Sequence, residues 1–230
     1  MPESSSSFYL GEQGQNYFAY QNKDADAAAR IELFKFRPYI SAQDSVLDFG
    51  CGGGWILRAL QPACATGVEI NPAARAVCEA HGTLVYPTLD AVPEATFTRI
   101  ISHHCLEHVP FPIETLKALH QRLETDGRLI LVLPVDDWRR QHDFTGTDKD
   151  HHLHTWTPRL IANTLSEAGF TCLEARILTH AFPRFWRPLS RLLPGFLFDL
   201  ACRFWAIGSK RRQLLAVARK SSSQTHSPTA

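Results

Sequence analysis

An acidic residue followed by glycines at alternating positions is the first feature of the sequence that indicates chemistry. It comes at the end of a short aliphatic run, which predicts a buried strand, and Trp55 then begins a helical pattern. Glycine suits such a turn because the backbone can take positive φ there and a ligand can approach closely. Backbone amides at the start of the following helix would then point to that ligand. The residues of this turn are Asp48, Gly50, Gly52 and Gly54.

A second acidic residue stands where the next strand is expected to end. Residues 65–70 predict that strand, and Glu69 follows Asp48 by about twenty residues, the interval expected for a ribose-binding carboxylate. The turn is not a dinucleotide fingerprint, because G-x-G-x-x-G requires a glycine at position 55, where this chain has Trp55.

The two anchors resemble those of the class I S-adenosylmethionine (SAM)-dependent methyltransferases. The stretches that carry the resemblance are LDFGCGGG, GVEINP, LEHV and HLHTWTP, and it covers most of residues 14–180. It implies S-adenosylmethionine as the cofactor, with the glycine turn under its amino acid and ribose portion. In this family an N-terminal segment lies across the cofactor. For Tyr20 in that segment, the plainer alternative is aromatic packing of the leader helix. The residues expected to bind the cofactor are Asp48, Gly50, Cys51, Gly52, Gly54, Glu69, Ile70, Asp90, His103 and Tyr20.

The adenine end of the family's pattern is altered in this chain. The acidic residue that usually follows a phenylalanine before the fourth strand is absent, because Phe97 is followed by Thr98. Asp90 is the nearest candidate for the acid that meets the adenine amino group, and it is displaced by a few residues.

Histidines gather in two predicted loops at the carboxyl ends of parallel strands, where ligands bind in such sheets. His103 and His104 follow the predicted strand 99–102, and a long polar loop over 135–155 should roof the site and define the acceptor. A methyl acceptor with a hydroxyl or amine must be aligned and lose its proton, and histidine titrates near neutrality. Each of these histidines has a plainer alternative, that of a hydrogen-bonded loop residue. The candidates for the base, in order, are His154, His151 and His104.

The run His151-His152-x-His154, with aspartates nearby, also raises the question of a zinc or magnesium site. The three histidines are crowded, no second cluster has ligand spacing, and the cysteines are not paired. The sequence therefore favours no metal.

Composition limits the class of protein. A chain of 230 residues with a formal net charge of +1 fits one α/β domain and gives no bulk argument for nucleic acid as a partner. Six scattered cysteines are typical of reduced thiols, and neither a signal sequence nor a spanning apolar run is evident. We therefore expect a cytoplasmic protein. Residues 1–13 and 221–230 are expected to be disordered.

Strands and helices alternate along the rest of the chain, which predicts a doubly wound sheet. The expected fold is α/β and Rossmann-like, with seven strands, mostly parallel, the last antiparallel as the resemblance implies. A single domain is expected over 14–220, with a cap helix over about 14–40, the core over 44–180 and 212–220, and a helical insertion over about 181–211. The first strand is expected in the aliphatic run that begins at Ser45 and ends at the glycine turn, and the others lie at 65–70, 83–86, 99–102, 128–133, 170–178 and 213–219.

The insertion is basic and rich in aromatic residues. From His180 to Lys220 there are nine lysines and arginines and one acidic residue, Asp199. The helix after Pro194 has only a narrow polar stripe, so its apolar surface must be covered by the protein itself, a second copy or a membrane. Basic amphipathic segments also bind anionic lipid surfaces. We expect packing over the active site or a homodimer, with peripheral contact at the inner face of a membrane as the alternative.

The predicted function is SAM-dependent methyl transfer to a small-molecule or lipid-linked acceptor, with oxygen favoured by its frequency in the family. One alternative is a catalytically silent SAM-binding partner subunit. Another is a nicotinamide-dependent oxidoreductase, against which Trp55 argues.

Overall fold

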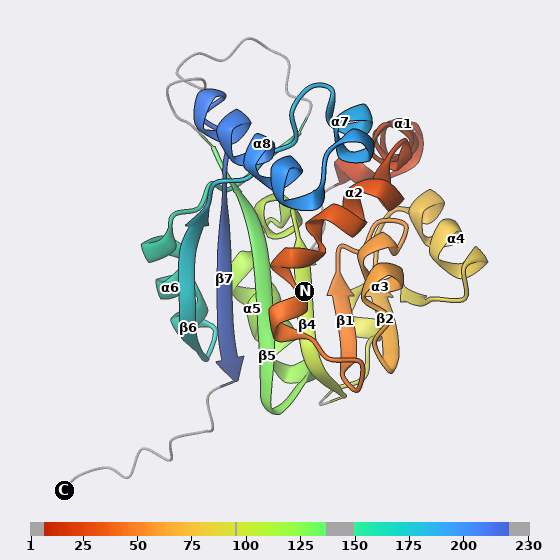
Figure 1. The fold of residues 1–230 in the computed structure, drawn as a ribbon. Coiled ribbons are helices and arrows are strands. Elements are labelled where there is room, and N and C mark those ends of the chain that lie inside the picture. The colour runs from red at the N-terminus through yellow and green to blue at the C-terminus, as the bar shows by residue number, and fades with distance from the viewer. Residues whose placement is uncertain (1–6, 95, 137–149, 221–230) are drawn as a thin grey trace, which may run out of the picture.

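A seven-stranded sheet organises the chain in the computed structural model, which describes residues 7–94, 96–136 and 150–220. The strand order is β3-β2-β1-β4-β5-β7-β6, and β7 runs antiparallel to both of its neighbours (Figure 1). This confirms the predicted Rossmann-like α/β fold with an antiparallel last strand. The strands are β1 (Ser45–Phe49), β2 (Cys64–Val68), β3 (Leu84–Tyr86), β4 (Phe97–His103), β5 (Leu123–Val135), β6 (Phe170–Leu178) and β7 (Arg212–Lys220).

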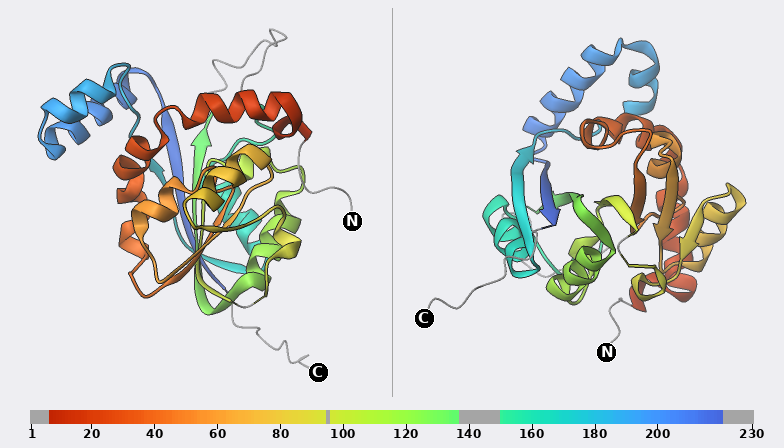
Figure 2. Two further views of the ribbon diagram at one scale, coloured as in Figure 1. Left: turned by 90° about the vertical axis from the view of Figure 1, so that its right-hand side faces the viewer. Right: turned by 90° about the horizontal axis from the view of Figure 1, so that it is seen from below.

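Helices cover both faces of the sheet, and each face has its own apolar core (Figure 2). Leu116 and Ile161 anchor α5 and α6 on one face, and Leu57 and Cys78 anchor α3 and α4 on the other. Residues 129–133 of β5 are fully buried because the strand is covered on both sides, as expected for a central strand of such a sheet. The helices are α1 (Gly11–Asn22), α2 (Ala25–Glu32), α3 (Trp55–Leu60), α4 (Pro72–Ala80), α5 (Pro112–Arg122), α6 (Pro158–Glu167), α7 (Trp186–Leu192) and α8 (Gly195–Gly208).

The N-terminal segment differs from its prediction. Ser7–Tyr9 forms a 3-10 helix and α1 begins at Gly11, so the expected disorder over 1–13 does not hold for the described residues. The order is explained by tertiary contacts, since Tyr9 binds residues more than ninety positions away and the Asn71 side chain donates to the carbonyl of Gly14 (2.7 Å). The rest of that prediction, and the one for 221–230, lies outside the described residues.

The fifth strand begins earlier than predicted. It was expected over 128–133, but β5 already begins at Leu123, which pairs with Phe97. The extra residues form a bulge, in which Asp126 takes a φ of 64°.

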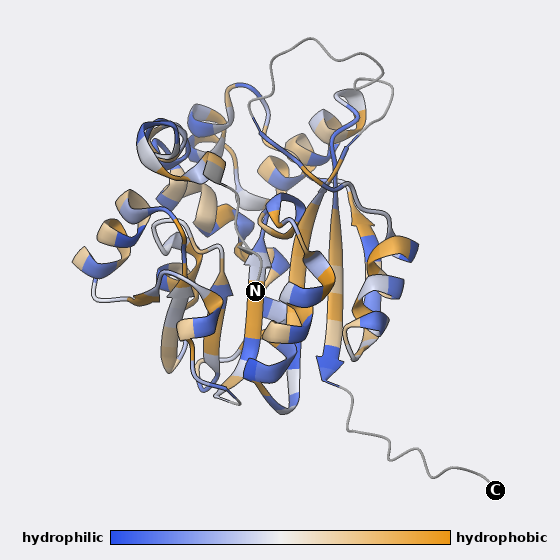
Figure 3. Cartoon of the chain, turned by 180° about the vertical axis from the view of Figure 1, so that it is seen from behind, coloured by the Kyte–Doolittle hydropathy of each residue, from blue (hydrophilic) through white to orange (hydrophobic). Residues whose placement is uncertain are grey.

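The insertion contains two helices, α7 and α8, at the edge where the parallel strands end (Figure 1). Only a narrow face of α8 is buried, formed by Phe198, Cys202 and Ala206. Within the described part of the chain, no helix is long and apolar enough to cross a membrane. Figure 3 shows apolar residues along this helix pair, and the large exposed ones are Phe185, Leu192, Phe196, Leu197, Leu200, Phe204, Trp205 and Ile207.

Candidate active site

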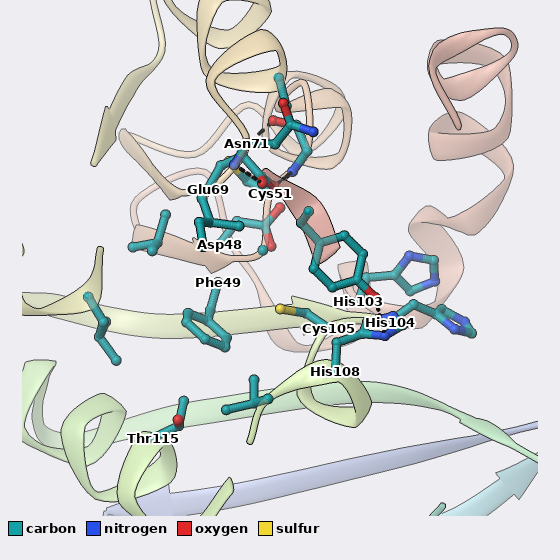
Figure 4. Close-up of a pocket in the computed structure, with 18 of the residues that line it drawn as sticks. Asp48, Phe49, Cys51, Glu69, Asn71, His103, His104, Cys105, His108 and Thr115 are labelled. Carbon is teal, nitrogen blue, oxygen red and sulfur yellow. Dashed lines mark hydrogen bonds between the residues drawn. The ribbon is translucent and has the colours of Figure 1, made fainter. Parts of the chain in front are cut away.

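A cavity of about 1140 Å³ lies at the carboxyl ends of the parallel strands, between the glycine turn and the N-terminal helices (Figure 4). Asp48 reaches it from the end of β1, and Glu69 from the residue after β2. His103 and His104 reach it from the end of β4. The elements that the sequence predicted therefore bring these four side chains to one place, as expected where parallel strands end together.

The glycine turn follows β1 in a left-handed backbone. Gly50, Gly52 and Gly54 have φ values of 78°, 54° and 74°, a region that costs other residues about 1–2 kcal/mol each. Space is also limited, because a Cβ atom on Gly52 would lie 2.7 Å from the Trp55 ring. Trp55 covers the turn and stacks on Phe18 of α1, with ring centroids 5.8 Å apart. The indole thus fills the position where a dinucleotide-binding turn has its third glycine.

Glu69 fastens the turn to the next loop. Its Oε2 accepts a hydrogen bond from the Gly52 amide at 2.9 Å, and its Oε1 accepts one from the Asn71 amide at 2.8 Å. Burial raises the pKa of Glu69, although the backbone donors act in the opposite direction. A carboxylate in this position has lone pairs left for two neighbouring hydroxyl groups of a ribose.

Asp48 is a buried carboxyl group that lacks a full set of partners. It is 2% exposed, and its Oδ1 has no hydrogen-bond partner among the described residues. Burial, with a smaller contribution from the charge of Glu69, raises the pKa of Asp48 to about 8. Leaving such a group unsatisfied is costly, so a ligand that brings donors or positive charge would be favoured here.

The fit of this site to S-adenosylmethionine follows from the charges. Asp48 and Glu69 face one cavity and repel each other's ionisation, so they favour a ligand with a cationic centre and hydroxyl donors. S-adenosylmethionine carries both. The pyrophosphate of a nicotinamide dinucleotide would bring negative charge to the same place, which disfavours the oxidoreductase alternative.

Most of the predicted cofactor residues line this cavity. Gly54 does not line it but is the N-cap of α3, in a left-handed conformation. Tyr20 is not brought to the cavity, because it points outward from α1 and is 81% exposed, whereas Tyr17 of the same helix lines it. Asp90 lines the cavity from an exposed position in the 3-10 helix Leu89–Ala91, which follows β3. The predicted residues in the lining are Asp48, Gly50, Cys51, Gly52, Glu69, Ile70, Asp90, His103 and His104.

The histidines predicted as bases separate into two groups. His104 lines the cavity and has an unusual φ of 53°, while its Nδ1 lies 3.6 Å from Oε1 of Glu107. His154 is not in the lining and makes a hydrogen bond through Nε2 to the carbonyl of Val109 at 2.9 Å. His151 also lies outside it and stacks on Phe8 at 4.4 Å. The plainer alternative, a hydrogen-bonded loop histidine, therefore describes His154, whereas the His151 ring is held by stacking. His104 is the candidate at the cavity. Much of the 135–155 loop lies outside the described residues.

Three residues near the cavity were not singled out from the sequence. Glu107 is fully buried in the 3-10 helix Leu106–His108, and His108 lines the cavity. Tyr9 lines it as well, from a segment expected to be disordered, and its hydroxyl lies 2.7 Å from His108 Nδ1. The LEHV stretch contained the signal for the first two, since a glutamate and a histidine follow the fourth strand there.

The pattern of a methyltransferase-domain family matches residues 16–175, which is more than half of the chain. The chain belongs to this family. Its cofactor is S-adenosylmethionine, and the matched region includes the glycine turn, both carboxylates and the histidines at the end of β4.

Among curated proteins, the chain is similar to O-methyltransferases of ubiquinone biosynthesis. It is 31% identical over 114 residues to the mitochondrial protein of Schizosaccharomyces pombe, covering 44% of this chain and 41% of that protein. The Pseudomonas aeruginosa protein is 32% identical over 102 residues, covering 39% of this chain and 44% of that protein. The match thus spans less than half the length of these relatives.

Solved structures share the fold at low sequence identity. A SAM-dependent methyltransferase from Archaeoglobus fulgidus has a TM-score of 0.63 at 17% identity, over 89% of this chain and 99% of that one. An S-adenosylmethionine-dependent methyltransferase from Mesorhizobium loti has a TM-score of 0.57 at 18% identity, over 82% and 97%.

The raised pKa of Asp48 predicts that cofactor affinity depends on pH. A cationic ligand favours the ionised carboxylate, so binding below pH 8 should release a proton, and affinity should rise by up to about tenfold per pH unit towards that value. Titration calorimetry from pH 6 to 9 with Asp48→Asn beside the wild type measures this, because the titration of the ligand's own amine is common to both. Parallel pH profiles for the two proteins would contradict the assignment. The same raised pKa affects the ligand-free protein. Its free energy of unfolding should fall as pH rises from 3.8 to about 8, because over that range the carboxyl group of Asp48 keeps its proton in the folded chain and loses it in the unfolded one.

Proposed function

We propose that the protein transfers the methyl group of S-adenosylmethionine to an oxygen atom of an amphiphilic small molecule. The observation that carries the proposal is one cavity lined by Asp48, Glu69 and His104, with a volume of about 1140 Å³. Pockets that hold one drug-sized ligand have volumes of about 300–1,000 Å³, so this larger cavity has room for a cofactor and an acceptor together. The names of the relatives, O-methyltransferases of ubiquinone biosynthesis, support oxygen as the acceptor atom and an amphiphilic substrate.

Each residue has a separate task in this proposal. Asp48 and Glu69 hold the cofactor, which when bound supplies a methyl group activated by its positively charged sulfur. His104 receives the proton of the acceptor hydroxyl, and its ring is kept near Glu107. Tyr9 and Tyr17 line the cavity and pack edge to face, 5.2 Å apart, so the N-terminal segment limits the access of water.

Transfer of labelled methyl from S-adenosylmethionine to a membrane lipid extract tests the proposal. We expect label in the organic phase with the wild type, and about 10²–10⁴-fold less with His104→Gln at unchanged cofactor affinity. His154→Gln is the matched control and should retain activity, since His154 is outside the cavity lining. Cofactor binding without transfer to any hydroxyl compound would favour the catalytically silent partner subunit instead.

The exposed face of α7 and α8 is the proposed route to an amphiphilic acceptor. Phe196 and Phe204 are 72% and 65% exposed, and the surrounding segment has nine basic residues against one acidic residue. This combination of apolar side chains and positive charge suits an anionic lipid surface better than a second copy of the same basic face. We therefore include peripheral binding to anionic membranes in the proposed function.

Sedimentation with vesicles tests this part. We expect binding to vesicles that contain phosphatidylglycerol, weaker binding to pure phosphatidylcholine, and a loss of about tenfold or more in a Phe196→Ser, Phe204→Ser double variant. The control is Leu84→Ser, which should bind vesicles normally. It removes an exposed apolar side chain from β3, the edge strand at the other end of the sheet from β6. Charge reversal should use Arg184 and Arg191, because Arg187 forms an ion pair with Asp24. A dimer in solution that the double variant dissociates, without vesicle binding by the wild type, would overturn the proposal.

A further inference from the structure

The buried Glu107 carboxylate marks a second polar centre at the wall of the cavity. Glu107 is 0% exposed, and neither Oε1 nor Oε2 has a hydrogen-bond partner within the described part of the chain. A buried charge of this kind is normally paired, hydrogen-bonded or bound to a metal ion. Two histidines could pair with this carboxylate if they were protonated. Their nitrogens lie beyond hydrogen-bonding distance of Oε1, with His104 Nδ1 at 3.6 Å and His108 Nε2 at 3.7 Å.

A third side chain completes a set of ligand atoms. Glu107, His108 and His152 each offer one atom, and these atoms all lie within 4.8 Å of one another. His152 comes from the loop that follows β5, and that loop is fixed to Glu107 by its backbone. The amides of Leu153 and His154 donate to the Glu107 carbonyl at 2.8 and 3.1 Å. The cluster therefore differs from the histidine run considered in the sequence, of which only His152 takes part.

The outer hydrogen bonds of both histidines fix the ring nitrogen that would bind a metal. Nδ1 of His152 lies 3.0 Å from Oδ2 of Asp136, which leaves Nε2 for a ligand. The Tyr9 hydroxyl donates to the carbonyl of Asp150 at 3.2 Å, so its oxygen can accept from His108 Nδ1–H at 2.7 Å. His108 Nε2 then presents its lone pair on the side of Glu107. His108 Nδ1 also lies 3.2 Å from the carbonyl oxygen of His151, so each histidine has the carboxylate or carbonyl partner that is usual around histidine ligands of metals.

We propose that Glu107, His108 and His152 form a binding site for a divalent transition-metal ion such as Zn²⁺. Two imidazole nitrogens and one carboxylate oxygen favour this class over Mg²⁺ and Ca²⁺, which prefer sites made of oxygen atoms alone. Three protein ligands leave a coordination position open, as in catalytic zinc sites. Since His108 also lines the cavity, an acceptor oxygen can take that position, and this last step rests on the proposed function.

Cobalt is a suitable probe, because the visible spectrum of Co²⁺ reports its coordination. The full chain without a histidine tag should be treated with a chelator and titrated with Co²⁺ and, by calorimetry, with Zn²⁺. We expect about one equivalent to bind, with His152→Gln weakening binding about a hundredfold or more and Asp136→Asn weakening it about 10–100-fold. His154→Gln is the matched control, since this neighbouring histidine is outside the cluster and should leave affinity unchanged.

The outcomes separate this inference from the proposed function. No cobalt spectrum with the wild type, or equal metal affinity in the His152→Gln and His154→Gln proteins, would overturn the metal site. Asp136→Asn provides a second readout if His152→Gln proves poorly folded by circular dichroism. S-adenosylmethionine should bind all the folded variants, because His152 and Asp136 are outside the cavity lining. A protein that binds Co²⁺ but transfers no methyl group would keep the metal site and reject the proposed function.

Discussion

Replacing Glu69 with glutamine will weaken the binding of S-adenosylmethionine by about a hundredfold or more. The carboxylate faces the cavity from the end of β2, and hydrogen bonds to a charged group contribute about 1.5–3 kcal/mol each. Since about 1.4 kcal/mol corresponds to a tenfold change in affinity, the loss of two such bonds to ribose hydroxyls would lower the affinity about a hundredfold or more. Titration calorimetry with S-adenosylmethionine and S-adenosylhomocysteine measures the loss directly.

The appropriate control is Glu79→Gln, which makes the same chemical change on the exposed surface of α4. Cofactor affinity in that variant should equal the wild-type value. The Gly52 and Asn71 amides bind different oxygens of Glu69, so glutamine keeps the acceptor for only one of them, and circular dichroism should first show that the variant is folded. Equal cofactor affinity in the Glu69→Gln and Glu79→Gln proteins would show that Glu69 holds the loop and not the cofactor.

Replacing Gly50 with alanine will lower the free energy of unfolding by about 2–5 kcal/mol. The left-handed backbone at φ 78° costs alanine about 1–2 kcal/mol. The added Cβ would also lie 2.3 Å from Sγ and 2.6 Å from Cβ of Cys105, and overpacking of this kind costs about 1–3 kcal/mol more. Urea denaturation followed by circular dichroism gives the difference.

Gly82→Ala separates the two contributions. Gly82 has a similar φ of 75°, but a Cβ atom there would meet nothing within 4 Å, so only the backbone cost of about 1–2 kcal/mol is expected. The cofactor site should be unaffected in this variant. A Gly50→Ala protein as stable as the Gly82→Ala protein would mean that the turn beside Cys105 is not closely packed.

The parallel core could be predicted because its signals are local. The run before Asp48 is aliphatic, the glycines are spaced for a turn, and residues 170–178 form the predicted strand β6 with the same bounds. Asp48 and Glu69 share a cavity because each ends one of two neighbouring parallel strands, which is a rule of topology and not of side-chain detail.

The remaining features depend on contacts between distant segments. Tyr9 is ordered by His108, ninety-nine positions away, and a polar serine-rich start gives no sign of that contact. Likewise, which histidines meet Glu107 depends on how the loop after β5 docks by its backbone to residues 106–108. Sequence spacing therefore favoured His151 and His154, whereas the fold brings His104 and His108 to the cavity.

A crystal structure with bound S-adenosylhomocysteine tests the site most directly. The geometry predicts the ribose hydroxyls within hydrogen-bonding distance of Glu69, the amino acid portion over the turn from Gly50 to Gly52, and the sulfur on the side of His104. A ligand bound elsewhere, or one with its ribose away from Glu69, would contradict the assignment of this cavity as the methyl-transfer site.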